Sequence, residues 1–537
     1  MLNPQETAQT NVSQSRWMLL YLMFTALLCG GLIMVVEVLG SRVIGPFFGV
    51  SLFVWTSLIT VTLIALALGY AIGGQLADRH GKAEYLFAII ILAGVAVLLI
   101  PFYKLLAIEL SVPLGLRLGA FVCASLLFGP SLFLMGCVSP FLVKLAATEL
   151  NNLGSTVGGL YAISTVGSVI GTVLTGFVLI AWLGVNSIFH LVGVLLCLLG
   201  LSYFLLWRRI WWTAALVVGL WFVPSQHSGA LPSVVAQDGT RVTLVANHDS
   251  HYGNLKVVDY QYQDQHIREM MIDGLIQGGV DMADGQSIYS YSYFLTLLPY
   301  ALHADINSAL VIGLGAGIVP QWLQQRGVVT DVVDIDEAVF EFAEKHFNVK
   351  VGGQKLVQDA RYVLQNSSAR YDLVVLDVFN GDTTPAHLLS LEALTLVAQR
   401  LNPEGILALN LVGDLQNSPF MTASVVKTLE QVFDQVQLYP TVDLKKAGGS
   451  GNLALIAFQG EARTPDLQRL AGMDVSRFAR QEVLANIGNR FVFPETTEAI
   501  VLTDDYNPID VFDSDLREGV RKAILDSTHW DILGYSG

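Results

Sequence analysis

The residues from Ser308 to Glu337 carry the pattern with the clearest chemical meaning in this chain. A short apolar run ends at a glycine-rich turn, GLGAG (313–317), and an amphipathic segment and a second apolar run follow it. The second run ends in the acidic sequence VDID, which contains Asp334. This order of strand, glycine turn, helix, strand and acidic residue is typical of a nucleoside-containing cofactor bound at the carboxyl edge of a parallel sheet.

The glycine and acidic positions of this unit each have a physical role in binding such a cofactor. Gly313, Gly315 and Gly317 let the backbone turn tightly beside the ligand. Asp334 follows the turn by about twenty residues, where a carboxylate can accept hydrogen bonds from both ribose hydroxyls. Asp359, at the end of the next expected strand, can accept from an adenine amine. The pattern predicts an adenosyl ligand and leaves open a nicotinamide dinucleotide or an S-adenosyl compound.

Short strands and helices alternate around this unit. The expected strands are 309–313, 329–335, 355–358, 372–377, 406–411 and 435–438. Such alternation predicts a Rossmann-like, doubly wound parallel sheet. Upstream, we expect a small antiparallel sheet from 240–250, 253–263 and 268–274, followed by an amphipathic helix over 286–302.

The first 230 residues have a different composition from the rest. They contain nine of the 30 Lys and Arg residues and six of the 45 Asp and Glu residues. Candidate membrane spans, each of about 20 apolar residues or more, are 17–39, 51–75, 84–104, 116–142, 156–182 and 186–206, with a shorter run at 210–224. We therefore expect a transmembrane α-helical bundle of six or seven spans over 1–230, a small β unit with a lead-in helix over 231–305, and the Rossmann-like domain over 306–537.

The loop GGQLADRHGK (73–82) bears on the side of the membrane. It resembles the cytoplasmic loop between the second and third helices of major facilitator transporters, and its cations agree with that side under the positive-inside rule. Six spans correspond to half of such a transporter and return the chain to the cytoplasm at Arg208. The run 210–224 is about 22 Å long as a helix, which is short of the roughly 30 Å bilayer core. We therefore expect a bacterial-type inner (plasma) membrane protein with a cytoplasmic soluble domain, and a periplasmic domain is the alternative.

Charge and ligand chemistry argue against several classes of partner. The remainder of the chain has 39 acidic and 21 basic residues, which disfavours nucleic-acid binding. All four cysteines lie in the apolar half and the ten histidines are scattered, so we expect no metal site. The expected partners are the lipid bilayer and a small-molecule acceptor, with a homodimer left open.

Several motifs of the acidic domain fall in a distinctive order. They are MIDGLIQ (271–277), Tyr291, IGLGAG, VDID, QDA and YDLVVLDVF (371–379). Their order and spacing resemble the spermidine synthase family over about residues 240–460. Membrane-fused members of that family also carry versions of GDTTPAHLL (381–389) and LTDDYNP (502–508). The chain therefore resembles a membrane-fused, spermidine synthase-like polyamine aminopropyltransferase.

The resemblance implies a reaction and a set of site residues. The family transfers an aminopropyl group from decarboxylated S-adenosylmethionine to a diamine, so the enzyme must deprotonate the attacking ammonium and align it. Asp377 matches the base that orients the amine, and Tyr291 matches a site tyrosine. The implied cofactor contacts are Gln277, Gly313, Gly315, Gly317, Asp334, Asp359 and Ala360. The expected substrate-binding residues are Asn380, Asp382, Asp504 and Asp505.

The chain departs from the family's pattern at three places. Ala316 replaces the aspartate that grips the aminopropyl ammonium, Asn380 replaces the second aspartate of a DxxD loop, and Ser292–Tyr293 replace a polar–glutamate pair. Cationic substrates need carboxylates to replace their lost hydration. We expect aminopropyl-type transfer from a decarboxylated S-adenosylmethionine-like donor to an amine acceptor. Two alternatives stay open: an S-adenosylmethionine-dependent methyltransferase, and a non-catalytic adenosyl-ligand sensor or transport-coupled protein.

Overall fold

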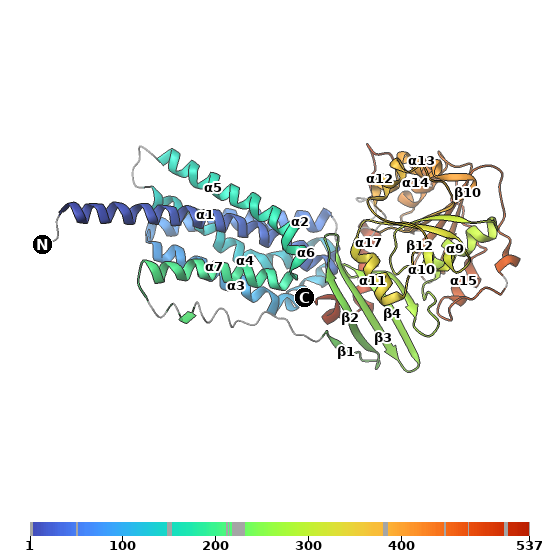
Figure 1. Ribbon diagram of the computed structural model, residues 1–537, viewed down its shortest axis with the longest axis horizontal. Coiled ribbons are helices and arrows are strands. Elements are labelled where there is room, and N and C mark those ends of the chain that lie inside the picture. The colour runs from blue at the N-terminus through green and yellow to red at the C-terminus, as the bar shows by residue number, and fades with distance from the viewer. Residues whose placement is uncertain are drawn as a thin grey trace. The chain divides into compact units, whose positions relative to one another are not determined.

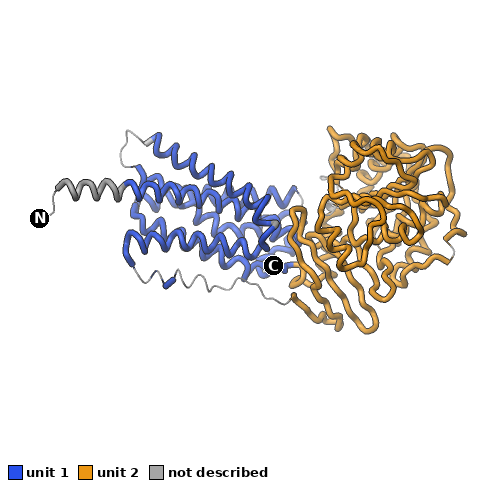
Figure 2. Tube along the Cα trace, viewed as in Figure 1, with its two compact units in different colours: residues 1–230, 534–537 blue, residues 231–533 orange. Residues whose placement is uncertain are grey.

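The chain divides into two compact units, residues 1–230 with 534–537 and residues 231–533 (Figure 2). The computed structural model describes residues 4–49, 52–147, 153–210, 213, 215–216, 231–379, 385–444, 447–470, 472–509 and 514–535. The described part of the first unit is helical, and the second unit combines helices with two sheets (Figure 1).

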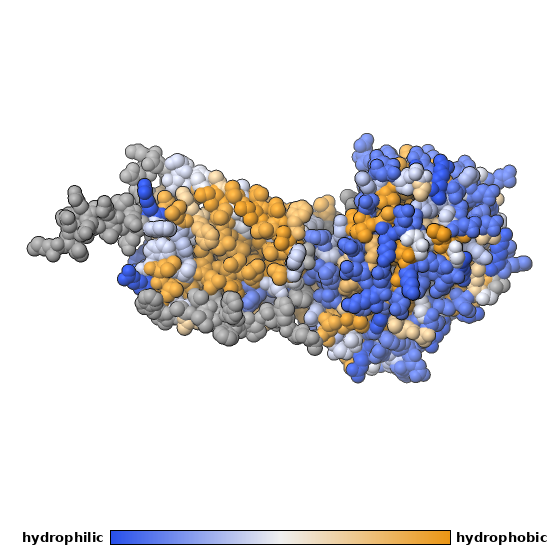
Figure 3. Space-filling view, viewed as in Figure 1, coloured by the Kyte–Doolittle hydropathy of each residue, from blue (hydrophilic) through white to orange (hydrophobic). Residues whose placement is uncertain are grey.

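The first unit is built from long apolar helices. They are α1 (Pro4–Phe48), α2 (Leu52–Arg79), α3 (Ala83–Ser111), η1 (Val112–Leu114), α4 (Gly115–Ala146), α5 (Leu153–Leu174), the π-helical η3 (Thr175–Leu179), α6 (Ile180–Trp182) and α7 (Val185–Leu206). Five described stretches are long and apolar enough to cross a membrane: Arg16–Phe48, Leu52–Arg79, Ala83–Ala146, Gly154–Leu179 and Val185–Leu206. Apolar side chains cover much of the visible face of this unit (Figure 3).

The six spans expected from the sequence fall on these stretches. Ala83–Ala146 contains two of them, since α3 and α4 are joined by the short 3-10 turn η1. The shorter run 210–224 lies largely outside the described residues. The number of membrane crossings and the side of the soluble domain stay predictions.

The second unit begins with a five-stranded antiparallel sheet in the order β1-β2-β3-β4-β5. Its strands are β1 (Ser233–Val235), β2 (Arg241–Asp249), β3 (Asn254–Tyr262), β4 (Gln265–Ile272) and β5 (Leu275–Asp281). The sequence analysis missed β1, which has only three residues, and β5, whose Gly278 and Gly279 weaken a strand pattern. Asp273 and Gly274 connect β4 to β5 with φ values of 48° and 78°, as a two-residue hairpin turn requires.

A seven-stranded sheet forms the centre of the second unit. Its strands are β6 (Ser308–Ile312), β7 (Val329–Asp334), β8 (Lys355–Val357), β9 (Tyr371–Leu376), β10 (Leu401–Asp414), β11 (Gln435–Pro440) and β12 (Ser450–Phe458). Their spatial order is β11-β12-β10-β9-β6-β7-β8. The pairs that link β10, β9, β6, β7 and β8 are parallel, and β12 is antiparallel to both β10 and β11.

This sheet confirms the Rossmann-like expectation and corrects it at one strand. The expectation of a parallel sheet does not hold at β12, which is antiparallel to its neighbours and was not predicted. Its connection from β11, residues 441–449, is too short for the helical crossover that a parallel neighbour needs.

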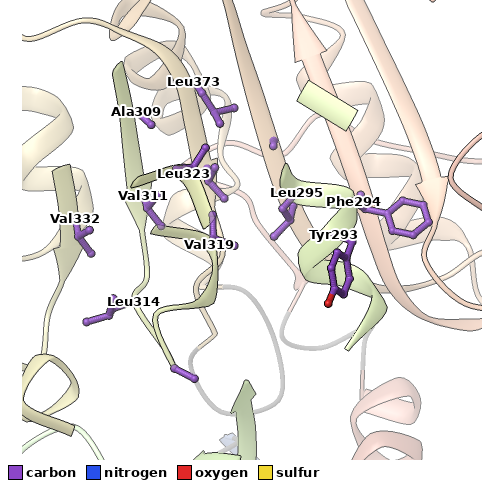
Figure 4. Packing of buried hydrophobic residues seen from close by; sticks show 14 of the residues in the cluster. Tyr293, Phe294, Leu295, Ala309, Val311, Leu314, Val319, Leu323, Val332 and Leu373 are labelled. Atoms are coloured by element: carbon purple, nitrogen blue, oxygen red, sulfur yellow. The ribbon is translucent and has the colours of Figure 1, made fainter. Parts of the chain in front are cut away.

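Helices cover both faces of this sheet: α9 (Ser290–Leu302), α10 (Ile318–Gln324), α11 (Glu337–Phe347), α12 (Ala360–Asn366), α13 (Leu391–Gln399) and α14 (Phe420–Leu429). The chain continues with α15 (Arg480–Asn486), α17 (Ser514–Ser527) and α18 (Trp530–Leu533). Alternate residues of β6 point to opposite faces, as a strand requires. Ala309 and Val311 join the core with α9, α10 and α11, whereas Leu310 and Ile312 join the core with α12, α13 and α14. Figure 4 shows the first core, with Phe294 of α9 and Val319 of α10.

Candidate active site

The strand order of the central sheet reverses between β6 and β9. From β6 the chain continues to β7 on one side, and from β9 it continues to β10 on the other. In open α/β sheets, ligands bind in the crevice at the carboxyl ends of the strands at such a point. Gly313 and Asp377 follow directly after these two strands, so the topology places both at the expected crevice.

Gly313 and Asp377 are packed side by side. The Asp377 amide donates to the Ile312 carbonyl at 2.9 Å, and the Gly313 amide donates to the Val333 carbonyl at 2.8 Å. A Cβ atom on Gly313 would lie 2.1 Å from the carbonyl oxygen of Asp377, and its φ is 92°. Both the conformation and the close approach therefore require glycine at this position.

The rest of the glycine turn brings β5 to the same place. A Cβ atom on Gly315 would lie 2.5 Å from the carbonyl oxygen of Gln277. Gly317 has a φ of 72° and directly precedes α10, and a Cβ atom on it would lie 2.3 Å from Val349. The hairpin of the small sheet thus places Gln277 against the turn that the sequence predicts to hold the nucleoside.

Asp334, at the end of β7, faces the glycine turn. One carboxylate oxygen accepts from the Leu314 amide and the other from the Asp336 amide, each at 3.0 Å. Burial raises the pKa of Asp334 to about 6, although these hydrogen bonds act in the opposite direction. A carboxylate has about four acceptor sites, so Asp334 retains capacity for the ribose hydroxyls predicted as its partners.

Asp359 lies at the start of α12. Its side chain accepts from the Tyr362 amide at 3.0 Å, and it lies 3.5 Å from the Nε2 atom of His387. Arg361, two residues further along, forms a two-pronged ion pair with Asp504, and this pair lowers the pKa of Asp504. The structure therefore places Asp504 near the predicted adenine contacts Asp359 and Ala360.

The remaining predicted substrate-binding residues are Asp505, Asn380 and Asp382. Asp505 is exposed. Asn380 and Asp382 lie outside the described residues.

Asp377 is held by a pair of asparagines that the sequence analysis missed. The side-chain amide of Asn410 donates to Asp377 at 2.8 Å, and that of Asn452 donates to Asn410 at 3.1 Å. Burial raises the pKa of Asp377 to about 6, and the hydrogen bond from Asn410 opposes the rise. Burial and the charge of Asp377 raise the pKa of Tyr291, so its phenol keeps its proton.

A second buried carboxylate, Glu269, contacts the aromatic side chain of Tyr289. Tyr289 donates a short hydrogen bond to Glu269, which is 7% exposed. Burial raises the pKa of Glu269, and hydrogen bonds from Tyr289 and Tyr260 oppose the rise. The ring centroid of Tyr289 lies 6.3 Å from that of Tyr291. Glu269 therefore holds the Tyr289 ring in its place near Tyr291.

A cavity of about 210 Å³ lies beside Asp377, Tyr291 and Gln277. It is lined by Leu275, Ile276, Gln277, Tyr289, Tyr291, Gly315, Asp377, Phe379, Val412, Asn452, Val520 and Ile524. Four of these residues are predicted site residues: Gln277, Tyr291, Gly315 and Asp377. Val520 and Ile524 come from α17, more than 140 residues after Asp377, and no motif pointed to them.

This arrangement suits transfer of an alkyl group from a sulfonium to nitrogen. The cavity lining combines Gly315 of the glycine turn with the Asp377 carboxylate and the aromatic rings of Tyr289, Tyr291 and Phe379. Aromatic faces stabilise a neighbouring cation, and a positioned carboxylate accelerates proton removal. Among the described residues, no group of three His, Cys, Asp or Glu side chains could hold a metal ion.

Comparison with known proteins shows which domain family part of this chain resembles. Residues 288–444 match the spermine/spermidine synthase domain. This match confirms the spermidine synthase-like part of the assignment made from the motifs. It contains Tyr291, the glycine turn, Asp334, Asp359 and Asp377, and it ends before β12 and α17.

Two curated relatives carry different activities in their names. A stretch of 231 residues is 31% identical to the N-terminal histidine N-methyltransferase of Emericella nidulans and covers 39% of this chain and 40% of that protein. A stretch of 123 residues is 35% identical to the polyamine aminopropyltransferase of Vibrio vulnificus and covers 22% of this chain and 41% of that protein. The chain thus spans less than half the length of each. Together with the domain match, the relative from Vibrio vulnificus supports a transferase of the polyamine aminopropyltransferase kind.

A solved structure, the probable spermidine synthase of Corynebacterium glutamicum, aligns with 48% of this chain and 95% of its own. The sequence identity is 18% and the TM-score is 0.39.

Proposed function

We propose that this chain is an integral-membrane transferase that moves an aminopropyl-type group from decarboxylated S-adenosylmethionine to an amine acceptor. The observation that carries the proposal is the position of Asp377. It lies at the strand-order switch point, against Gly313 of the glycine turn, in a cavity shared with Tyr291 and Gln277. The match to the spermine/spermidine synthase domain supports the same reaction class.

The proposed reaction gives separate roles to the donor-binding residues and to Asp377. The glycine turn, Asp334 and Asp359 hold the adenosyl part of the donor. Asp377 takes a proton from the acceptor ammonium, and the freed nitrogen lone pair attacks the carbon next to the sulfonium. The carbon–sulfur bond breaks and its electrons return to sulfur, which releases neutral methylthioadenosine. A carboxylate with a pKa of about 6 is ionised at neutral pH and is a stronger base than an ordinary aspartate.

The helical unit anchors this transferase in a bilayer in our proposal. Its five apolar stretches support that role by length and composition. We propose a bacterial-type inner membrane with the transferase domain on the cytoplasmic side, where adenosyl donors are made. An impermeant cysteine reagent, applied to intact cells carrying one engineered cysteine near residue 240, tests the side. Labelling there contradicts the cytoplasmic placement.

Methyl transfer from intact S-adenosylmethionine is the second candidate. Ala316 is 2% exposed and packs against Gly278, where a Cβ atom would lie 3.0 Å from that of Ala316. The position that grips the aminopropyl ammonium in the family is thus filled by an apolar contact. The relative from Emericella nidulans is named as a nitrogen methyltransferase, and the same base could serve either transfer.

Product analysis separates the candidates. The full chain, purified in detergent, is incubated with each donor and a panel of amines, and products are identified by mass spectrometry. We expect methylthioadenosine from the decarboxylated donor, at least 100-fold less of it from Asp377→Asn, and no change from the exposed control Asp305→Asn. S-adenosylhomocysteine without methylthioadenosine favours methyl transfer. Donor binding without either product contradicts both and favours the sensor alternative.

A further inference from the structure

Part of the lining of the Asp377 cavity consists of apolar side chains from distant parts of the chain. Val520 and Ile524 come from α17, and Val412 comes from β10. Ile524 is 7% exposed, and Val520 is half-buried. These side chains line the same cavity as Asp377, Tyr291 and Gly315 of the glycine turn.

Buried polar contacts fix α17 to the small antiparallel sheet. The guanidinium of Arg521, which is fully buried, donates to the Asp273 carbonyl of the β4–β5 hairpin at 3.0 Å. Further on, Lys256 donates to the Leu533 carbonyl at 3.2 Å. The apolar wall is therefore a built part of the cavity.

The described lining offers one carboxylate to an acceptor. Asp377 is the single acidic side chain among the lining residues that the structure describes. Glu269 is not among the lining residues, and it accepts a hydrogen bond from Tyr289. A diamine whose first nitrogen meets Asp377 would have to strip water from its second ammonium against valine and isoleucine, and an unpaired buried charge is strongly disfavoured.

We infer that the acceptor carries one reactive nitrogen on an apolar body, and that Val520 and Ile524 select it. This inference rests on the proposed function and narrows its substrate class. The apolar body fills the space beside α17 and the nitrogen points to Asp377. A second cationic group on the acceptor lowers its affinity.

A matched pair of amines tests the selection by binding, without turnover. Pentylamine and 1,4-diaminobutane have nearly the same length and differ by one terminal methyl or ammonium group. Their affinities are measured by calorimetry on the full chain in detergent, saturated with methylthioadenosine. We expect pentylamine to bind at least tenfold more tightly. Equal affinities, tighter binding of the diamine, or no binding of either amine overturns the inference.

Variants on one helix locate the selection. Val520→Asp is expected to shift the affinity ratio by at least tenfold towards 1,4-diaminobutane, because the new carboxylate can pair with the second ammonium. Ala523→Asp adds the same charge on the exposed side of α17 and should leave the ratio unchanged. An unchanged ratio in Val520→Asp, or an equal shift in both variants, overturns the role of the apolar wall.

A second variant guards against misfolding of the first. Val520→Phe keeps the wall apolar and shortens the cavity, so pentylamine should weaken at least tenfold while methylthioadenosine affinity is kept. Unchanged pentylamine binding overturns the inference. Because these measurements require no turnover, they are separate from the product analysis. If the chain prefers 1,4-diaminobutane and still releases methylthioadenosine, the proposed function stands and the inference about an apolar acceptor is wrong.

Discussion

Asn410 donates a 2.8 Å hydrogen bond to the carboxylate of Asp377, and this bond joins β10 to the carboxyl end of β9. Asn410 is 1% exposed and accepts in turn from Asn452 of β12. The base is thus fixed by two neutral side chains that add no charge to the site. Such a partner orients a carboxylate and limits the rise of its pKa while leaving it basic.

The first prediction concerns the pH dependence of transfer. Asp377 acts as a base only when ionised, so kcat/KM should rise with pH through an inflection near the pKa of about 6 and then level off. Asn410→Leu removes a hydrogen bond that stabilises the charged form, so its inflection should lie at higher pH. A pH–rate profile of both proteins checks this. An inflection at the same pH in Asn410→Leu would show that the bond does not tune the base.

The second prediction concerns stability. The pKa of Asp377 is raised in the folded state, so the folded protein binds its proton more tightly than the unfolded chain does. The resulting stabilisation is complete below pH 4 and is lost as pH rises through about 6, by up to about 3 kcal/mol. Asp377→Asn should therefore have a higher Tm than wild type at pH 8, and the difference should shrink towards pH 4. A lower Tm of the variant at pH 8 would contradict this account.

The third prediction separates backbone strain from close contact in the glycine turn. Gly327→Ala, at φ 82° with nothing within 4 Å, should cost about 1 kcal/mol of stability and leave donor binding unchanged. Gly313→Ala adds a 2.1 Å collision with the Asp377 backbone and should also weaken donor binding at least tenfold. Thermal unfolding and calorimetry with the donor check both. Equal effects of the two variants would show that strain alone accounts for the glycine.

The fourth prediction decides the role of Asp504. Its ion pair with Arg361 is partly exposed, so breaking it should cost at most about 1 kcal/mol. If the pair steadies the first turn of α12 beside Asp359, Asp504→Asn should raise the donor Kd by up to about fivefold and leave the acceptor KM unchanged. Asp505→Asn, in the exposed neighbour, serves as the comparison. A rise in acceptor KM with an unchanged donor Kd would instead support the predicted role of Asp504 in binding the acceptor.

The donor half of the site could be predicted because its determinants are local in sequence. Gly313, Gly315, Gly317 and Asp334 lie within one strand–turn–helix–strand unit, and glycine and acidic residues at fixed spacing signal their roles. The structure brings them together with Asp377, which follows the adjacent strand. Their binding roles stay predictions.

The residues that we propose for the acceptor side could not be predicted, because they are apolar or neutral and lie far apart in the sequence. Val520 and Ile524 have the pattern of any buried helix face, and only tertiary packing brings them to the cavity. Asn410 and Asn452 lie in strands whose apolar neighbours dominate the pattern. The strand β12 itself was missed, because its apolar run follows a connection too short to suggest the parallel topology expected elsewhere.

The domain match ends at residue 444, yet Asn452 and both cavity residues of α17 lie beyond it, and Gln277 lies before residue 288 where it begins. If Val520 and Ile524 select the acceptor as we infer, proteins that share only the matched segment can keep one donor chemistry and differ in the molecule that they modify. Substitutions over 514–533 could then change the acceptor without any change in the sequence of the matched segment. Grouping such chains by residues near positions 520 and 524 would sort them by acceptor more faithfully than overall similarity.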